Sequence, residues 1–297
     1  MERLQAAVRA ELYRMDLIAG LDIHPFAQFV WRSAEMKLKW AGRLKMARSL
    51  HDRAEYEMVK RGRRKCATLH IGPRDYDARI EQIARDGLVW LPIQRTKTYS
   101  GFSHRHYATD ANDPNSTVYG ALARTLEDAE AFRTASAYGA QAQDGKGTVD
   151  HGSIGDLLGF PTCCCDFFNE VWPMGCYDPI WQAAVNTPDS ERVSETHIKA
   201  RGSVHAHQLL RYLGFRITSH LPCSFGCEET TKVGKAWLEV MRELDPLGTD
   251  ALLDILRLPV RWRCYRGVAV LETEAFIAST NSMPTEREYI IDFKTAD

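Results

Sequence analysis

Residues 159–165 read Gly-Phe-Pro-Thr-Cys-Cys-Cys, so three adjacent cysteines follow a glycine and a proline. Gly159 predicts the end of a short helix over 156–158, because glycine readily adopts the left-handed backbone that terminates helices. Pro161 predicts a new helix over 162–172, because its fixed φ angle suits a first helical turn. The three cysteines then lie in that first turn, where free N–H groups and the helix dipole stabilise thiolates.

A second cysteine segment, residues 220–227, reads His-Leu-Pro-Cys-Ser-Phe-Gly-Cys. If a helix begins near Ser224, Cys223 and Cys227 lie on one face at its N-terminus, because residues four apart are neighbours on a helix. A helix is predicted over 228–244, with acidic residues in its first turn. Two helix starts would then each present thiolates, and we predict that the two segments form one site.

Consecutive helical residues point about 100° apart, so three adjacent cysteines cannot all reach one ion. The predicted ligand set is Cys163, Cys164, Cys223 and Cys227, and four thiolates suit Zn²⁺ or an iron–sulfur cluster. Adjacent cysteines can reach different corners of a [4Fe–4S] cube. Structural zinc sites draw on cysteine pairs with two to four residues between them, a spacing that Cys223 and Cys227 fit but adjacent cysteines do not. The sequence therefore favours a [4Fe–4S] cluster, with Zn²⁺ as the alternative and metal-free packing of the cysteines as the third reading.

The frame formed by residues 158–168 and 220–227 resembles an uncharacterised prokaryotic family of unknown function. The resemblance covers about residues 100–275 and implies that the two cysteine segments belong together. Cys165 is extra to the family's pattern, which is a reason to leave it out of the ligand set. The resemblance implies no particular reaction.

Cys223 and Cys227 are also similar to the beginning of the three-cysteine loop of radical S-adenosylmethionine enzymes. Thr230 stands where the third cysteine of that loop would follow, so the standard motif is absent. Binding of S-adenosylmethionine would therefore need another arrangement, such as chelation of its amino and carboxylate groups at an open iron.

Three histidines and one arginine are the other candidate site residues. His220 lies three residues before Cys223 and is predicted as a proton donor, or as a hydrogen-bond donor behind the ligands. His104 and His106 would share one face of an extended segment and are predicted as acid–base groups, with Arg105 between them binding a cofactor. The simpler alternatives are a surface loop for the pair and a backbone hydrogen bond for His220.

The composition is that of a globular protein, with 44% hydrophobic and 26% charged residues. Apolar residues recur at helical spacing after Pro25, which predicts one long helix that reaches Met58. A strand over 66–71, a helix over 77–85 and a strand over 88–93 predict a small α/β unit. Further helices are expected over 113–138, 176–184, 205–213 and 252–258, and further strands over 215–218, 260–271 and 289–293.

The predicted fold class is α+β, helix-rich with a small mixed sheet. An N-terminal helical region over 1–64 is expected to pack on a core domain over 65–297 that carries the cysteine site. The N-terminal region is rich in lysine and arginine, most densely at residues 60–65. We predict that this basic tip is a solvated helix end, with a contact to RNA or phosphate as the alternative.

No apolar run approaches the roughly 18 residues that can cross a membrane. The charged start of the chain does not fit a signal peptide. We therefore expect a cytoplasmic protein whose eight cysteines stay reduced. The formal net charge of -1 gives no general case for binding nucleic acid or a membrane surface.

These observations favour an iron–sulfur enzyme that acts on a small polar metabolite. The cluster would accept electrons from a donor protein or use an open iron as a Lewis acid, with S-adenosylmethionine as a candidate cofactor. The first alternative is a zinc-stapled protein that binds RNA or another polyanion. The second is a metal-free enzyme with one cysteine of the triplet as nucleophile.

Overall fold

The computed structural model describes residues 28–98, 106–108, 113, 115–136, 149–171, 179–265, 268–281 and 287–294. Its helices and two separate sheets confirm the predicted α+β class. Among the described residues, those within 1–51 and 171–297 form one compact unit, here called unit 1, and those within 52–100 and 105–170 form unit 2. This division does not coincide with the predicted boundary after residue 64.

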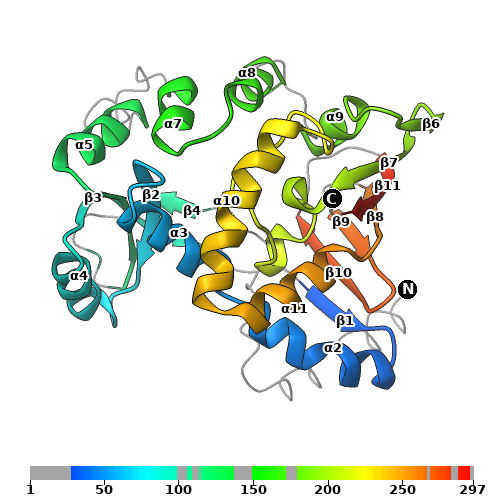
Figure 1. Cartoon of the computed structure of the whole chain (residues 1–297), viewed down its shortest axis with the longest axis horizontal. Helices are drawn as coiled ribbons and strands as arrows, with labels where there is room; N and C mark the ends of the chain where they lie inside the picture. The colour runs from blue at the N-terminus through cyan, green and yellow to red at the C-terminus, as the bar shows by residue number, and fades with distance from the viewer. Residues whose placement is uncertain are drawn as a thin grey trace. The chain divides into compact units, whose positions relative to one another are not determined.

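Unit 2 contains a four-stranded sheet in the order β2-β5-β3-β4 (Figure 1). Its strands are β2 (Cys66–Ile71), β3 (Val89–Thr98), β4 (His106–Ala108) and β5 (Thr117–Ala123). Helix α4 (Tyr76–Arg85) connects β2 to β3, as the sequence predicts. Both strands pair antiparallel with β5, so a later strand fills the gap between them in a split β-α-β arrangement.

Apolar clusters cover both faces of this sheet, because successive residues of a strand point to opposite sides. Leu122 of β5 belongs to the cluster on the side of α3 and α4, whereas Ala121 and Ala123 belong to the cluster on the side of α5 and α7. These helices are α3 (Leu50–Lys60), α5 (Leu126–Ala135) and α7 (His151–Leu157). A central strand buried on both faces is expected to be apolar throughout, as β5 largely is.

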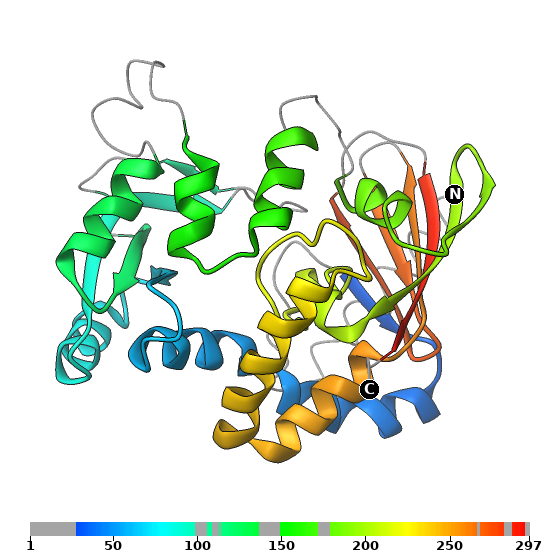
Figure 2. The same ribbon diagram turned by 45° about the horizontal axis from the view of Figure 1, so that its top comes forward.

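Unit 1 contains a seven-stranded sheet in the order β1-β10-β9-β8-β11-β7-β6 (Figure 2). Its strands are β1 (Gln28–Trp31), β6 (Glu191–Ser194), β7 (His197–Ser203), β8 (Val260–Tyr265), β9 (Val268–Glu272), β10 (Phe276–Asn281) and β11 (Arg287–Lys294). β7 and β11 pair in parallel, and the other described pairs of this sheet are antiparallel. The sheet is therefore mixed, but it is larger than the small sheet that the sequence predicts.

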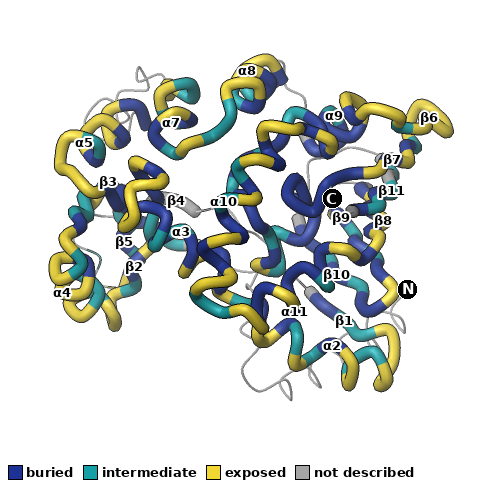
Figure 3. Tube along the Cα trace, viewed as in Figure 1, coloured by how far each residue is buried: buried dark blue, intermediate teal, exposed yellow. Residues whose placement is uncertain are grey.

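The helices of unit 1 are α2 (Ala34–Ala47), α9 (Pro179–Val185), α10 (Glu228–Leu244) and α11 (Pro246–Leu256). α10 has one buried and one exposed face, coloured dark blue and yellow in Figure 3. Trp237 and Met241 lie four residues apart on the buried face, as in an amphipathic helix. In the part of the chain that the structure describes, no helix is long and apolar enough to cross a membrane.

The long helix predicted from Pro25 to Met58 is wrong where the structure describes it. Residues 28–31 form β1, which pairs with β10, and α2 begins only after Ser33, whose hydroxyl accepts the N–H of Met36. A residue with a positive φ of 58°, Ser49, then separates α2 from α3. The apolar periodicity was shared by two helices and part of a strand, which spacing alone does not distinguish.

Other predicted elements are wrong because distant partners decide them. The helix expected over 113–138 is β5 followed by α5, since β2 and β3 pair with the two edges of β5. The strand expected over 215–218 is irregular, and the carbonyl of Thr218 accepts a hydrogen bond from the side chain of Gln208. The helix expected over 205–213 is two short 3₁₀ turns, and the long strand over 260–271 is the hairpin of β8 and β9.

Asp245 ends α10 and caps α11, since its carboxylate accepts the N–H of Gly248 at 2.8 Å. We predict that Asp245→Ala lowers the free energy of unfolding by about 1 kcal/mol, the usual cost of a lost N-cap. Urea unfolding followed by tryptophan fluorescence measures the change. Asp250→Ala, at an exposed position of the same helix, is the control. Equal stability of the two variants would show that the cap contributes nothing.

Candidate metal centre

The turn before the three cysteines forms as the sequence predicts. Gly159 has a φ of 66°, and α8 (Thr162–Val171) begins directly after Pro161. The carbonyl of Pro161 accepts the N–H of Cys164 at 2.9 Å and that of Cys165 at 3.0 Å, which closes the first helical turn. The triplet therefore occupies the N-terminus of a helix.

Arg64 supports this turn from a distant point of the sequence. Its guanidinium lies 5.6 Å from the centre of the Phe160 ring and forms an ion pair with Glu55. Arg64 is only 5% exposed, so it is not part of a solvated helix end as predicted for residues 60–65. A buried arginine that is paired and stacked on a ring holds the turn that precedes α8.

The three cysteines differ in their surroundings. Cys163 is exposed and Cys164 is buried, with their sulfur atoms 3.9 Å apart. Cys165 packs against α7, so closely that a side chain added at Gly155 would overlap its sulfur. Burial, followed by neighbouring carboxylates such as Asp156, raises the pKa of the Cys165 thiol. Cys165 therefore has a packing role, which agrees with leaving it out of the ligand set.

The helix after the second cysteine segment has the predicted bounds of 228–244, and the conditional start near Ser224 is not met. α10 begins at Glu228, not near Ser224, because Cys227 is its N-cap and its sulfur accepts the N–H of Thr230 at 3.4 Å. Cys223 therefore lies in the loop before the helix and not on a helical face. Phe225 is fully buried and anchors this loop, since its N–H donates to a threonine hydroxyl and its carbonyl accepts a backbone N–H.

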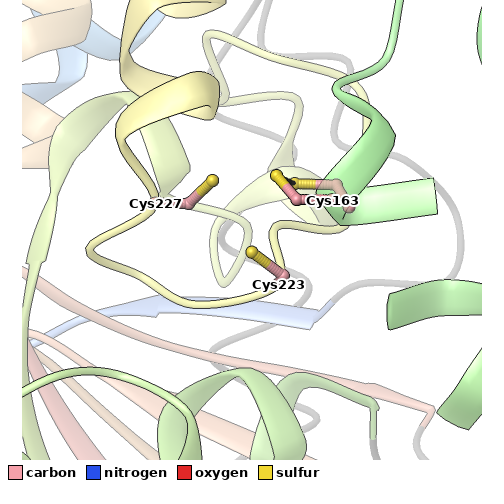
Figure 4. A group of neighbouring side chains, drawn as sticks. Cys163, Cys223 and Cys227 are labelled. Atoms are coloured by element: carbon pink, nitrogen blue, oxygen red, sulfur yellow. Dashed lines mark hydrogen bonds between the residues drawn. The ribbon is translucent and has the colours of Figure 1, made fainter. Parts of the chain in front are cut away.

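Cys163, Cys164, Cys223 and Cys227 come together as the sequence predicts. Their sulfur atoms all lie within 4.8 Å of one another. Figure 4 shows the sulfurs of Cys163, Cys223 and Cys227 pointing toward one another. Cys164 and Cys227 are buried, Cys223 is partly buried and Cys163 is exposed. This group of four thiols could bind a metal ion.

The spacing of the sulfurs bears on which metal fits. Zn–S bonds of about 2.3 Å place the sulfurs of a tetrahedral site about 3.8 Å apart. The distance of 3.9 Å between the sulfurs of Cys163 and Cys164 is close to that value. In a [4Fe–4S] cluster each thiolate binds a different iron, so the sulfurs stand farther apart than around one ion. The group therefore needs a small contraction to hold one ion and an expansion to hold a cube.

His220 lies behind one of the predicted ligands. It is 4% exposed, and its Nε2 shares a 2.9 Å hydrogen bond with the hydroxyl of Thr230. The N–H of Thr230 donates to the sulfur of Cys227, so His220 reaches that sulfur through one intervening residue. This position matches the predicted supporting role, whereas the predicted role as a proton donor stays a prediction.

The other predicted site residues are not placed in this group. His104 and Arg105 lie outside the described residues, as does the side chain of His106. The backbone of His106 begins β4 at the edge of the four-stranded sheet, opposite Thr98. The acid–base and cofactor-binding roles given to these residues stay predictions.

Comparison of the chain with protein-family models, with characterised proteins and with solved structures finds no match. The resemblance to an uncharacterised prokaryotic family therefore stays a prediction. The site is therefore defined by its geometry alone: four cysteines lie close enough together to bind a metal ion.

Thr230 and Arg64 support the site, a role that the sequence patterns predict for neither residue. Thr230 lies three residues after the N-cap of α10, where a backbone N–H regularly bonds to the capping side chain, so its contact with Cys227 follows a local rule. Arg64 and Phe160 are far apart in the sequence, and no local pattern indicates their contact.

Two further histidines, His205 and His207, are buried in unit 1 with exposed fractions of 2% and 0%. Burial lowers the pKa of His205 to about 4 and that of His207 to about 3. In the unfolded chain both are expected to titrate near 6.5. The folded protein therefore keeps both side chains neutral at a pH where the unfolded chain binds protons.

We predict that the protein loses stability as the pH falls from 7 to 5, because protons bind the unfolded chain and not the two buried imidazoles. The loss amounts to roughly 2 kcal/mol for each histidine. His207→Leu removes one contribution, so its urea midpoint should change less between the two pH values than that of the wild type. His70→Gln, at an exposed position, is the control. An unchanged pH dependence in His207→Leu would contradict the prediction.

Proposed function

We propose that this is a metal-binding protein in which Cys163, Cys164, Cys223 and Cys227 hold one tetrahedral ion, with Zn²⁺ as the expected metal. The observation that carries the proposal is the approach of all four sulfurs to within 4.8 Å of one another. Tetrahedral coordination by four thiolates is typical of zinc and of iron–sulfur sites. The short spacing favours the single ion over the cluster that the sequence favoured.

The charge of such a site supports a bound cation. Four thiolates at these distances repel one another, and a divalent ion offsets the repulsion. The positive ends of two helix dipoles also offset this repulsion, because Cys163 and Cys164 lie in the first turn of α8 and Cys227 caps α10. Each helix start favours the thiolate over the thiol.

Closed coordination points to a structural role for the ion. Four protein ligands fill the tetrahedral shell of Zn²⁺ and leave no position for a substrate, whereas catalytic zinc sites keep one position open. The ion would fix the loop 220–227 and the start of α8, two segments that are far apart in the sequence. An enzyme with an open iron would require one of the four thiolates to stay unbound.

The two alternatives from the sequence gain less support. Lys60 and Arg61 of the basic tip form ion pairs of 2.7 and 3.1 Å with Asp86 and Glu57, which weakens the case for attracting phosphates. Within the triplet, the raised pKa of the Cys165 thiol makes that residue a poor nucleophile. We therefore propose metal binding in place of polyanion binding or thiol catalysis.

Elemental analysis tests the proposal on full-length protein purified without oxygen. We predict one zinc per chain and no inorganic sulfide. Cys164→Ala and Cys223→Ala each remove one ligand, and zinc content should fall well below that of the wild type. Cys165→Ala is the matched control, since it makes the same change in the same helical turn and should leave zinc content unchanged.

A second measurement does not depend on the folding of any variant. Zinc is removed from the wild-type protein with a chelator and added back, and the cysteines are then alkylated and located by peptide mass. Bound zinc should protect the four site cysteines from alkylation, whereas the alkylation of Cys165 should be the same with and without zinc. In the elemental analysis, iron together with inorganic sulfide would identify an iron–sulfur cluster in place of zinc. Equal zinc content in Cys164→Ala and Cys165→Ala would overturn the proposed ligand set.

A further inference from the structure

One side-chain hydrogen bond joins the two ends of the segment that carries Cys223 and Cys227. His220 Nε2 and Thr230 Oγ1 lie 2.9 Å apart, and the two residues are 4% and 0% exposed. His220 begins the cysteine loop, and Thr230 lies in the first turn of α10 directly after it. The bond therefore closes the loop at its base, away from water, where a hydrogen bond is strong and its loss is costly.

Thr230 connects this bond to the sulfur of Cys227. Its backbone N–H donates to that sulfur at 3.4 Å, while its hydroxyl bonds to His220. Because both groups belong to one residue, the histidine that holds the hydroxyl also restrains the N–H that points at the ligand. The hydrogen bond to sulfur stabilises negative charge on the sulfur atom.

Other bonds hold different parts of the loop. Phe225 N–H donates to Thr187 Oγ1 at 3.0 Å, and Phe225 O accepts the N–H of Ser203 at 2.8 Å. The hydroxyl of Thr231 donates to the carbonyl of Cys227 at 3.1 Å. These contacts fix the middle of the loop and the backbone of the cap, whereas Thr230 contacts the ligand sulfur itself.

We propose that His220 is a positioning residue for the metal site, acting through Thr230 on the sulfur of Cys227. The pair sets the direction of that sulfur and thereby how tightly the site binds Zn²⁺. This inference rests on the proposed function. Groups that orient metal ligands in this way typically account for about 10- to 100-fold in metal affinity. In this role His220 acts on the site through the orientation of the sulfur of Cys227.

Zn²⁺ affinity and the visible spectrum of the Co²⁺-substituted protein test the inference. Thr230→Val keeps the shape and the N–H but removes the hydroxyl, and His220→Leu removes the imidazole. Each variant is predicted to weaken Zn²⁺ binding by about tenfold or more. The Co²⁺ bands should shift in both, because they report the arrangement of the four sulfurs. The double variant should resemble the single ones, since all three lack the same hydrogen bond.

Conservative variants and a matched control separate positioning from general stability. Thr230→Ser retains the hydroxyl, and His220→Gln places an amide near the position of Nε2, so both should restore much of the affinity and the wild-type bands. Thr249→Val is the control, because Thr249 is also fully buried in the N-terminal part of a helix, with its hydroxyl bonded to Asp245 O at 2.8 Å. It should lower thermal stability without moving the Co²⁺ bands.

The outcomes distinguish this inference from the proposed function. If wild-type protein binds neither Zn²⁺ nor Co²⁺, the metal site itself is wrong. If the wild type binds both ions and Thr230→Val and His220→Leu keep its affinity and bands, the site stands and the positioning role is wrong. Weaker binding with unchanged bands, equal to the effect of Thr249→Val, would also overturn the positioning role, because it would reflect stability alone.

Discussion

Four cysteine sulfurs lie within 4.8 Å of one another, and the repulsion that they would exert as metal-binding thiolates is the constraint that the structure around the site must meet. Thiolates at such distances need a cation and nearby positive charge. The chain supplies positive charge locally by starting a helix at each cysteine segment. α8 begins at Thr162 beside the triplet, and α10 begins after Cys227, whose own sulfur serves as the cap. Three of the four cysteines that could bind a metal, Cys163, Cys164 and Cys227, are therefore also parts of helix termini.

Buried polar contacts hold both helix starts in place. Arg64 packs on Phe160 and pairs with Glu55 behind the turn that precedes α8. His220 and Thr230 bond to each other behind Cys227. Groups of this kind are costly to bury, and they persist because each has a partner. The site thus depends on residues other than the four cysteines, and their loss would disturb the sulfurs without removing one.

The grouping of the four cysteines and the starts of the two helices could be predicted from the sequence. Gly159 and Pro161 indicate the end of one helix and the start of the next. The structure agrees, because Gly159 has a positive φ angle and α8 begins directly after Pro161. The acidic first turn of α10 predicts that helix from Glu228, where it begins, whereas the capping role of Cys227 was not predicted because a cysteine is not among the usual capping residues. The distances between the four sulfurs could not be predicted, because they depend on how two segments that are distant in the sequence come together.

The sequence by itself determined where the two helices begin and the α+β class, because these follow from short-range rules for glycine, proline and apolar spacing. It also indicated that the two cysteine segments group together, because four thiolates suit one metal site. Only the tertiary structure decided the strand identity of residues 117–123, which pair on both edges, and the size of the seven-stranded sheet. It also decided the burial of Arg64, the packing of Cys165 on Gly155 and the contact of His220 with Thr230. The physical reason is that strand pairing, side-chain burial and ligand spacing depend on partners brought together by folding, which no local pattern specifies.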